Sequence, residues 1–225
     1  MADETRPGGA ASGDLVRDLD GADAAVIDGR SARRDRNLES MLDATIALIA
    51  EGNLTPTTAE VADRCELSQR SVNRYFGDVH VMQQAAAERA VIRGTPRFKI
   101  HAIGRGPRDR RVREFVEVRV RAQVEMGPTA RAAKQYEQTS TYIREQMEGV
   151  RLLLCDQVER QFAPELAALG PQVRAATVLA IDTLFQFESL DHNLNERALP
   201  ADELTDLLCI AVDQLLSAAG DSTSG

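Results

Sequence analysis

The segment 57–76 constrains the fold more than any other part of the chain, because two capped helix starts stand close together in it. Thr57 is followed three residues later by Glu60, and such a capping box satisfies two amide donors at the start of a helix. Ser68 has the side chain of a second N-cap. Only a tight turn fits between the two segments. The spacing therefore predicts two short helices, 57–64 and 68–76.

Helical signals continue on both sides of this pair. From about Arg34 to Glu51 apolar side chains recur at three- and four-residue steps, which predicts an amphipathic helix that Gly52 ends. Gly77 breaks the segment 68–76, and Asp78 can cap a further helix that reaches about Arg93. The side chains expected on the buried face of the first helix are Leu38, Met41, Leu42, Thr45 and Ile49.

The C-terminal half is also expected to be helical. Glycine and proline are frequent in residues 94–111, where we place a linker between two domains. In 112–126, valines alternate with charged residues at a strand period, but the length of the segment and its end at Gly127-Pro128 favour a helix. The sequence therefore predicts an all-α protein with domains at 31–93 and 112–220, and C-terminal helices at 112–126, 129–162, 171–193 and 200–219.

The net charge of −8 is distributed unevenly. Residues 1–30 hold seven acidic and three basic groups without an apolar period, and we expect a disordered acidic extension. A solvated leader is favoured there over an interaction tail or a mimic of DNA. Residues 31–100 are nearly balanced, with ten basic and nine acidic groups, so the acidity lies outside the predicted short helices. Residues 221–225 are expected to form a disordered tail.

A basic stretch runs from Arg93 to Arg113, with eight basic residues and one acidic residue. A solvated hinge is the favoured interpretation of this stretch. An auxiliary patch that contacts phosphates is the alternative.

Several classes of protein are disfavoured. The cysteines (Cys65, Cys155 and Cys209) and the three histidines are scattered, so we expect no metal, no cofactor and no disulfide framework. No apolar run is long enough for a membrane span, and the N-terminus lacks the apolar stretch of a secretory signal, so a cytoplasmic protein is expected. No nucleophile, base or phosphate loop indicates an enzyme; surface solvation explains the grouping of Glu188, Asp191 and His192 better.

The two short helices have the dimensions of a helix-turn-helix, in which the second helix enters the major groove of DNA. Around the apolar Val72 and Phe76, the expected outer face of 68–76 is polar and basic. Arginine can pair with guanine, and glutamine or asparagine with adenine, while amides at helix starts can hold phosphates. The sequence therefore predicts binding to double-stranded DNA through Thr57, Thr58, Ser68, Gln69, Arg70, Ser71, Asn73 and Arg74.

Residues 33–93 resemble the N-terminal domain of the tetracycline-repressor (TetR) family. The resemblance is carried by Leu42-Asp43-Ala44, Glu51-Gly52, Pro56 to Ala62, Leu67-Ser68, Tyr75-Phe76 and Met82. It implies that Thr58, Tyr75 and Arg74 position phosphates and that Gln69, Arg70, Ser71 and Asn73 read bases; Tyr75 could instead pack into the small core. The sequence departs from the family at two positions. Glu66 stands where a turn glycine is common, and Val79 where a lysine often meets phosphate, which puts the operator affinity in doubt.

The resemblance also implies a C-terminal domain that binds a small-molecule effector and forms a homodimer. Residues expected to line the effector pocket are Phe115, Arg119, Met126, Tyr136, Tyr142, Met147 and Phe185, and Arg119 suits an anionic group. Residues expected at the dimer interface are Val178, Ile181, Leu184, Leu207, Leu208, Ala211 and Leu215, with the protomer's own core as the alternative. The predicted function is a dimeric repressor of a pseudo-palindromic operator, released by its ligand. A regulator without small-molecule control and a helical adaptor or enzyme are the alternatives.

Overall fold

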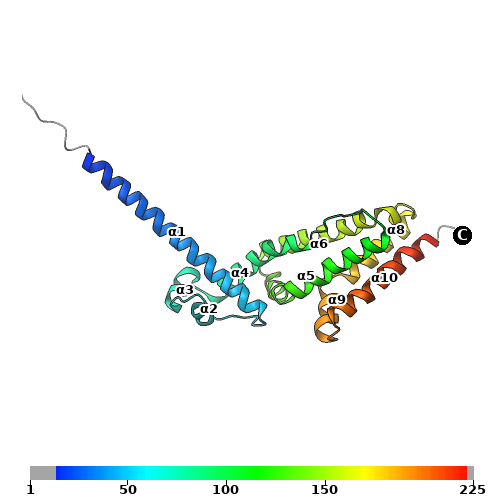
Figure 1. Ribbon diagram of the computed structural model, residues 1–225. Coiled ribbons are helices and arrows are strands. Elements are labelled where there is room, and N and C mark those ends of the chain that lie inside the picture. The colour runs from blue at the N-terminus through cyan, green and yellow to red at the C-terminus, as the bar shows by residue number, and fades with distance from the viewer. Residues whose placement is uncertain (1–13, 222–225) are drawn as a thin grey trace, which may run out of the picture.

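The computed structural model describes residues 14–221, with side chains described from 31 to 217. Every regular element in this range is helical, so the expected all-α fold is confirmed there. A small N-terminal unit holds α1 to α3, and α4 leads from it into a bundle formed by the later helices (Figure 1). Within the described residues, no helix is both long and apolar enough to cross a bilayer.

Helix α1 (Asp14–Ala50) is longer than the sequence indicated. Its second half buries Met41, Leu42, Thr45 and Ile49 as expected. Residues 14–30, where a disordered extension was expected, continue this helix in the structure, away from the other elements (Figure 1). An apolar period shows whether a helix packs against something, whereas an existing helix can extend without packing as long as no proline interrupts it. Residues 1–13 and 222–225 lie outside the described part of the chain.

The next three helices begin at the predicted caps. They are α2 (Thr58–Arg64), α3 (Gln69–Phe76) and α4 (Val79–Gly94), with Thr57, Ser68 and Asp78 as their N-caps. A small core joins them to α1. Its fully enclosed members include one side chain from each helix, namely Met41, Val61, Val72 and Met82.

The bounds of helix α5 (Arg108–Tyr136) differ from two predictions, the extent of the linker and the helix end at Pro128. The linker is shorter than 94–111, because its last four residues already belong to α5 and residues Thr95–Phe98 form the short helix η1. The helix also continues through Pro128, where a break was expected. A proline inside a helix costs about 3 kcal/mol. Helices α1, α4, α6, α9 and α10 all pack against α5. Burial on several sides offsets the cost of the proline, and it also explains why valines at a strand period lie in a helix.

The remaining elements surround α5. They are α6 (Thr141–Gln161), α7 (Ala163–Leu166), α8 (Pro171–Leu184), α9 (Phe187–Asp191), the π-helix η2 (His192–Glu196) and α10 (Ala201–Asp221). The predicted helix 129–162 therefore begins later, at the capping Ser140. The predicted helix 171–193 is divided, because Gln186 is extended. The ring of Phe185 at this break packs edge-on against Phe115, with 5.0 Å between ring centroids.

A buried ion pair connects α5 to α7. Arg111 donates to both carboxylate oxygens of Glu165 and to the carbonyls of Gly106 and Gln161. The side chains of Arg111 and Glu165 are only 4% and 15% exposed. Burial alone would raise the pKa of Glu165, but the hydrogen bond and the charge of Arg111 outweigh burial and lower it. The pair therefore stabilises the fold above the ordinary carboxyl pKa, and this stability is lost as the pH falls through the lowered value.

We predict that Glu165→Ala lowers the free energy of unfolding by about 3–5 kcal/mol, because it leaves the Arg111 charge buried without a partner. Glu159→Ala is the matched control, since Glu159 pairs with Arg174 (2.6 Å) on the surface. It should change the free energy by less than about 1 kcal/mol. Urea denaturation of both variants measures the difference. Losses of equal size would contradict the structural weight given to the buried pair.

Candidate functional site

The outer face of α3 is polar and basic. Gln69, Arg70, Asn73 and Arg74 are exposed, and Ser71 is half-buried. On the opposite side Val72 is fully buried in the small core. No carboxylate of the described residues pairs with Arg70 or Arg74, so both guanidinium groups remain available to a ligand. The predicted base readers thus share one accessible face.

The caps fix the two short helices but also occupy some predicted phosphate contacts. The Thr57 hydroxyl accepts from the Glu60 amide (3.3 Å), and Glu60 accepts from the Thr57 amide (2.7 Å) and hydroxyl (2.7 Å). These hydrogen bonds lower the pKa of Glu60, the one from the backbone amide most strongly. Ser68 accepts from the Ser71 amide (3.2 Å). The side chains of Thr57 and Ser68 are therefore committed to capping. The groups that remain for phosphate are the backbone amides of the residues directly after each cap.

Gln69 joins the two helices directly. Its side-chain amide donates to the hydroxyl of Thr58 (3.2 Å). Because both residues were predicted to contact DNA, one as a base reader and one at phosphate, this bond has to open or rearrange before Gln69 can pair with adenine.

The turn between α2 and α3 is closed by backbone hydrogen bonds and contains Glu66. This residue has a φ of 56°, in the left-handed region that favours glycine. The amide of Leu67 donates to the carbonyl of Ala62 (2.9 Å), and that of Glu66 to the carbonyl of Asp63 (3.3 Å). Glu66, which departs from the family's glycine, therefore carries backbone strain in a turn that these hydrogen bonds close. At Val79, the other departure, the side chain packs against the small core and supplies no cation.

A basic notch lies between α1 and α3, lined by Arg33, Arg34, Asn37, Leu67, Ser71, Arg74 and Tyr75. The guanidinium groups of Arg34 and Arg74 lie 6.0 Å and 5.8 Å from the centre of the Tyr75 ring. Tyr75 both packs against the small core and faces this notch. Its packing is therefore compatible with the phosphate contact, which stays a prediction. Arg33 and Arg34 were missed in the sequence. The signal was an arginine pair at the start of the first amphipathic helix.

The basic stretch from Arg93 to Arg113 is largely neutralised within the chain. Five of its eight basic residues form ion pairs: Arg93 with Asp43, Arg97 with Glu125, Arg108 with Asp213, Arg111 with Glu165 and Arg113 with Asp206. Pairing of this extent leaves little charge for an auxiliary phosphate patch.

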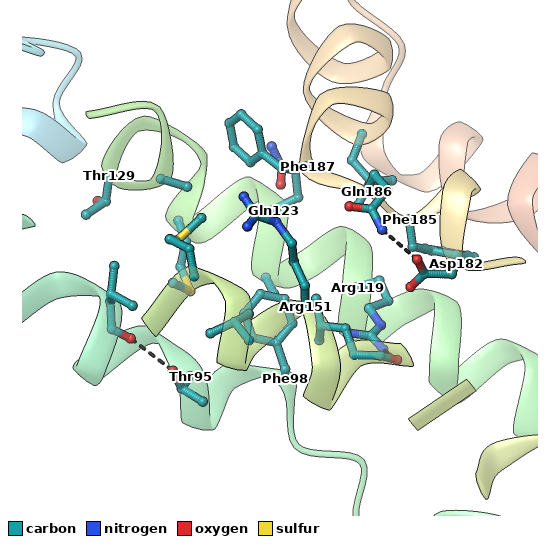
Figure 2. A pocket seen from close by; sticks show the side chains of 18 of the residues that line it. Thr95, Phe98, Arg119, Gln123, Thr129, Arg151, Asp182, Phe185, Gln186 and Phe187 are labelled. Atoms are coloured by element: carbon teal, nitrogen blue, oxygen red, sulfur yellow. Dashed lines mark hydrogen bonds between the residues drawn. The ribbon is translucent and has the colours of Figure 1, made fainter. Parts of the chain in front are cut away.

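A cavity of about 100 Å³ lies among α4, η1, α5, α6, α8 and α9 (Figure 2). Five predicted pocket residues line it: Phe115, Arg119, Met126, Met147 and Phe185. Two others do not. The Tyr136 hydroxyl instead donates to Gln83 in α4 (2.6 Å), and Tyr142 is 40% exposed on α6. Both were placed in the pocket because they are aromatic, which does not specify the direction of a side chain.

Arg119 is the buried cation of this cavity, with an exposed fraction of 2%. Its Nη2 donates to the Leu154 carbonyl (2.9 Å), whereas Nε and Nη1 have no hydrogen-bond partner among the described residues. Burial lowers the pKa of Arg119 to about 10, and the charge of Asp182 opposes that shift. In Figure 2 Asp182 and its partner Gln186 lie on the same side of the cavity as Arg119.

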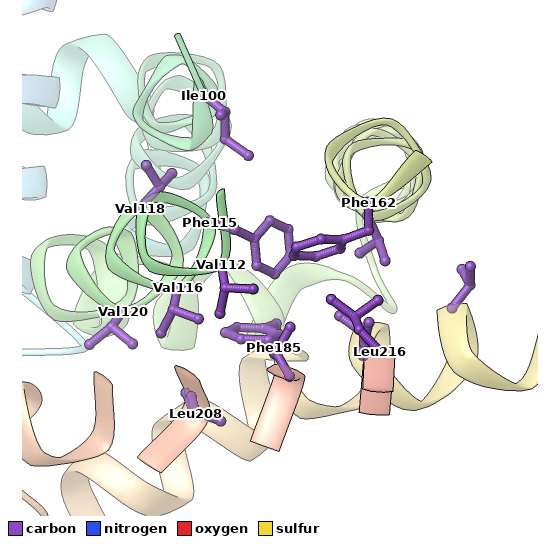
Figure 3. Packing of buried hydrophobic residues seen from close by; sticks show 14 of the residues in the cluster. Ile100, Val112, Phe115, Val116, Val118, Val120, Phe162, Phe185, Leu208 and Leu216 are labelled. Carbon is purple, nitrogen blue, oxygen red and sulfur yellow. The ribbon is translucent and has the colours of Figure 1, made fainter. Parts of the chain in front are cut away.

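The predicted dimer residues divide between the core and the surface. Val178, Ile181 and Leu208 are buried inside the protomer, and Leu184 and Leu215 pack against the same core. Figure 3 shows Leu208 and Leu216 of α10 among the side chains of this core. Ala211 is half-buried, and Leu207 is 49% exposed. The buried ones form the protomer's own core, so their assignment to an interface was wrong. Exposed on the same two helices are Leu179 (67%) and Ile210 (60%), which the sequence period did not distinguish from core positions.

Solved structures share this fold. A TetR-family transcriptional regulator from Streptomyces coelicolor matches with a TM-score of 0.64 at 19% identity, over 84% of this chain and 83% of its own. A transcriptional regulator from Rhodococcus sp. Rha1 gives a TM-score of 0.59 at 18% identity, over 81% and 97%. One from Pseudomonas aeruginosa PAO1 gives 0.58 at 14%, over 84% and 94%. At these identities the likeness establishes the fold, which confirms the TetR-like architecture.

No protein-family model matches the sequence, and no curated protein does.

We predict that Glu66→Gly raises the free energy of unfolding by up to about 1 kcal/mol. The left-handed conformation costs an L-residue roughly 1–2 kcal/mol, of which the greater backbone entropy of glycine cancels a part. Glu66→Ala is the control, since it removes the same charge but keeps the strain. Chemical denaturation measures both variants. Equal gains would show that charge, and not backbone strain, is relieved.

Proposed function

We propose that this chain is a DNA-binding transcriptional regulator, acting as a dimeric repressor of a pseudo-palindromic operator and released by a small-molecule effector. The outer face of α3 carries the proposal, because it presents two amides and two arginines that pair with no carboxylate of the described residues, on a helix that is capped and anchored by Val72. Its fold, which solved transcriptional regulators share, supports the same function.

In this proposal α3 enters the major groove, where Arg70 near its N-terminus reads a guanine. Arg33, Arg34 and Arg74 of the basic notch contact the flanking phosphates. Phosphate contacts fix the register of the helix, and base contacts select the sequence. The strained turn at Glu66 sets the angle at which α3 leaves α2.

A twofold dimer would present two copies of α3 to successive major-groove faces. Leu179 on α8 and Leu207 and Ile210 on α10 support such an interface, because they are large, apolar and exposed in the single chain. We place the interface on the outer sides of these two helices, in place of the buried positions expected from the sequence.

A chain of contacts joins the cavity to the N-terminal unit that holds α2 and α3. Val91 and Met147 line the cavity and pack in one cluster with Tyr136. Tyr136 donates to Gln83 (2.6 Å), and Gln83 donates to the carbonyl of Pro56 (2.9 Å), just before the cap of α2. We propose that an effector that displaces Met147 or Val91 shifts α4 through this chain, so that it selects a conformation with misplaced α3 helices.

Selection from random duplexes by mobility shift tests the function. We predict enrichment of a pseudo-palindrome, and for Arg70→Ala a loss of roughly 1–3 kcal/mol in binding with relaxed preference at one base pair per half-site. Arg34→Ala should weaken all duplexes alike and reduce the salt dependence, as a phosphate contact does.

Arg160→Ala is the control for this comparison, because Arg160 is exposed on α6 and pairs only with Asp156 (3.2 Å). It removes the same charge but should leave both affinity and base preference unchanged. An Arg70→Ala protein that weakens every duplex equally would make Arg70 a phosphate contact. The absence of any salt-sensitive binding by the unaltered chain would refute the proposed function.

A further inference from the structure

The guanidinium of Arg119 is incompletely satisfied inside the cavity. A guanidinium has five N–H donors, and the structure commits one, from Nη2 to the Leu154 carbonyl (2.9 Å). Nε and Nη1 are buried without a hydrogen-bond partner among the described residues. The rings of Phe115 and Phe98 lie 4.8 Å and 5.8 Å from the guanidinium carbon, and they stabilise its charge without accepting its remaining protons.

A buried charge in this state is costly, because it has lost water and gained no full partner. Arg119 remains protonated at neutral pH even though burial lowers its pKa to about 10. The negative charge of Asp182 raises the pKa of Arg119 and so opposes the effect of burial, but the two side chains form no ion pair. The Asp182 carboxylate accepts a hydrogen bond from Gln186 (2.6 Å) instead. A packed apolar side chain would be more stable at position 119, so the arginine is better explained by a ligand than by the fold.

The other cations of the cavity wall are already paired. Arg151 bonds to Glu137 (2.5 Å), and Lys134 bonds to Glu188. Most of the remaining wall is apolar, with Phe98, Met126, Leu154 and Phe187 among its members. The cavity therefore combines one incompletely satisfied positive charge with a mainly apolar enclosure. The carboxylate of Asp182 also lines it and already accepts a hydrogen bond from Gln186, so an anion attached to a hydrocarbon body fits at Arg119.

We propose that the effector is a small organic carboxylate with an aryl or alkyl body, whose carboxylate pairs with Arg119. The inference rests on the proposed role of the cavity as the effector site. A cavity of about 150 Å³ admits benzene, so a volume of about 100 Å³ holds roughly four non-hydrogen atoms before a side chain moves. A longer body requires the flexible side chains of Met126 and Met147 to move and widen the cavity.

Calorimetric titration of the full-length chain tests the proposal with octanoate and phenylacetate, whose apolar bodies fit the cavity once the methionine side chains move. Their uncharged amides, octanamide and phenylacetamide, serve as shape controls. We expect at least one carboxylate to bind and its amide to bind about 10-fold more weakly or worse, because hydrogen bonds to charged groups are the stronger ones. Inorganic phosphate, which has charge but no apolar body, should not bind.

Two arginine variants assign the site. Arg119→Met should weaken carboxylate binding about 10-fold or more and abolish the preference over the amide. Arg151→Met should retain both, because Arg151 already pairs with Glu137. Circular dichroism melts check that the variants fold. If Arg119→Met does not fold, Arg119→Lys is used instead and should keep a weakened preference for the carboxylate, since it preserves the charge but loses the planar fork.

The inference is overturned if neither carboxylate binds, if an amide binds as well as its carboxylate, or if Arg151→Met and not Arg119→Met removes the preference. Mobility shifts with a selected duplex separate this result from the function itself. Carboxylate binding by a chain that binds no DNA would refute the regulator while leaving the cavity assignment in place. DNA binding without carboxylate discrimination would refute only the inference.

Discussion

The rest of the structure depends on the packing of α4, which contacts α5 and α6 of the bundle as well as α1 and α3 of the N-terminal unit. A β-carbon at Gly94 would lie 1.9 Å from the terminal methyl of Met126, so a larger residue at this position requires the methionine to move. At its other end, α4 inserts Met82 into the small core beneath α3. The same helix thus forms a wall of the cavity and supports the N-terminal unit that holds α3. A change at one site has a short physical route to the other.

A strained backbone residue lies at one candidate site and an incompletely satisfied charge at the other. Glu66 holds a left-handed conformation in the turn that precedes α3, and Arg119 holds a charge with unused donors beside the cavity. The buried pair of Arg111 and Glu165, by contrast, has a hydrogen-bond partner at every guanidinium nitrogen and lines neither the cavity nor the basic notch. Local costs of this kind persist where the surrounding structure supports them, and they are typical of positions with a role in binding.

The starts of α2, α3 and α4 could be predicted because they depend on capping hydrogen bonds between residues close in the sequence. Thr57, Ser68 and Asp78 cap their helices through atoms within a few residues, so sequence spacing alone specifies where these helices begin. The C-terminal bundle was predicted less well because its elements depend on distant contacts. Nothing local to Pro128 shows that α5 is packed on several sides, and nothing near Gln186 shows that α8 ends there. Apolar period likewise could not separate the buried Leu208 from the exposed Ile210 on α10.

The central claim is that two copies of α3 read one operator, which requires two protomers on each duplex. Sedimentation velocity of the full-length chain with a selected pseudo-palindromic duplex measures this directly. We predict a complex of two protomers per duplex that dissociates as salt is raised, because phosphate contacts release counterions. A single protomer per duplex, or an association that is insensitive to salt, would contradict it.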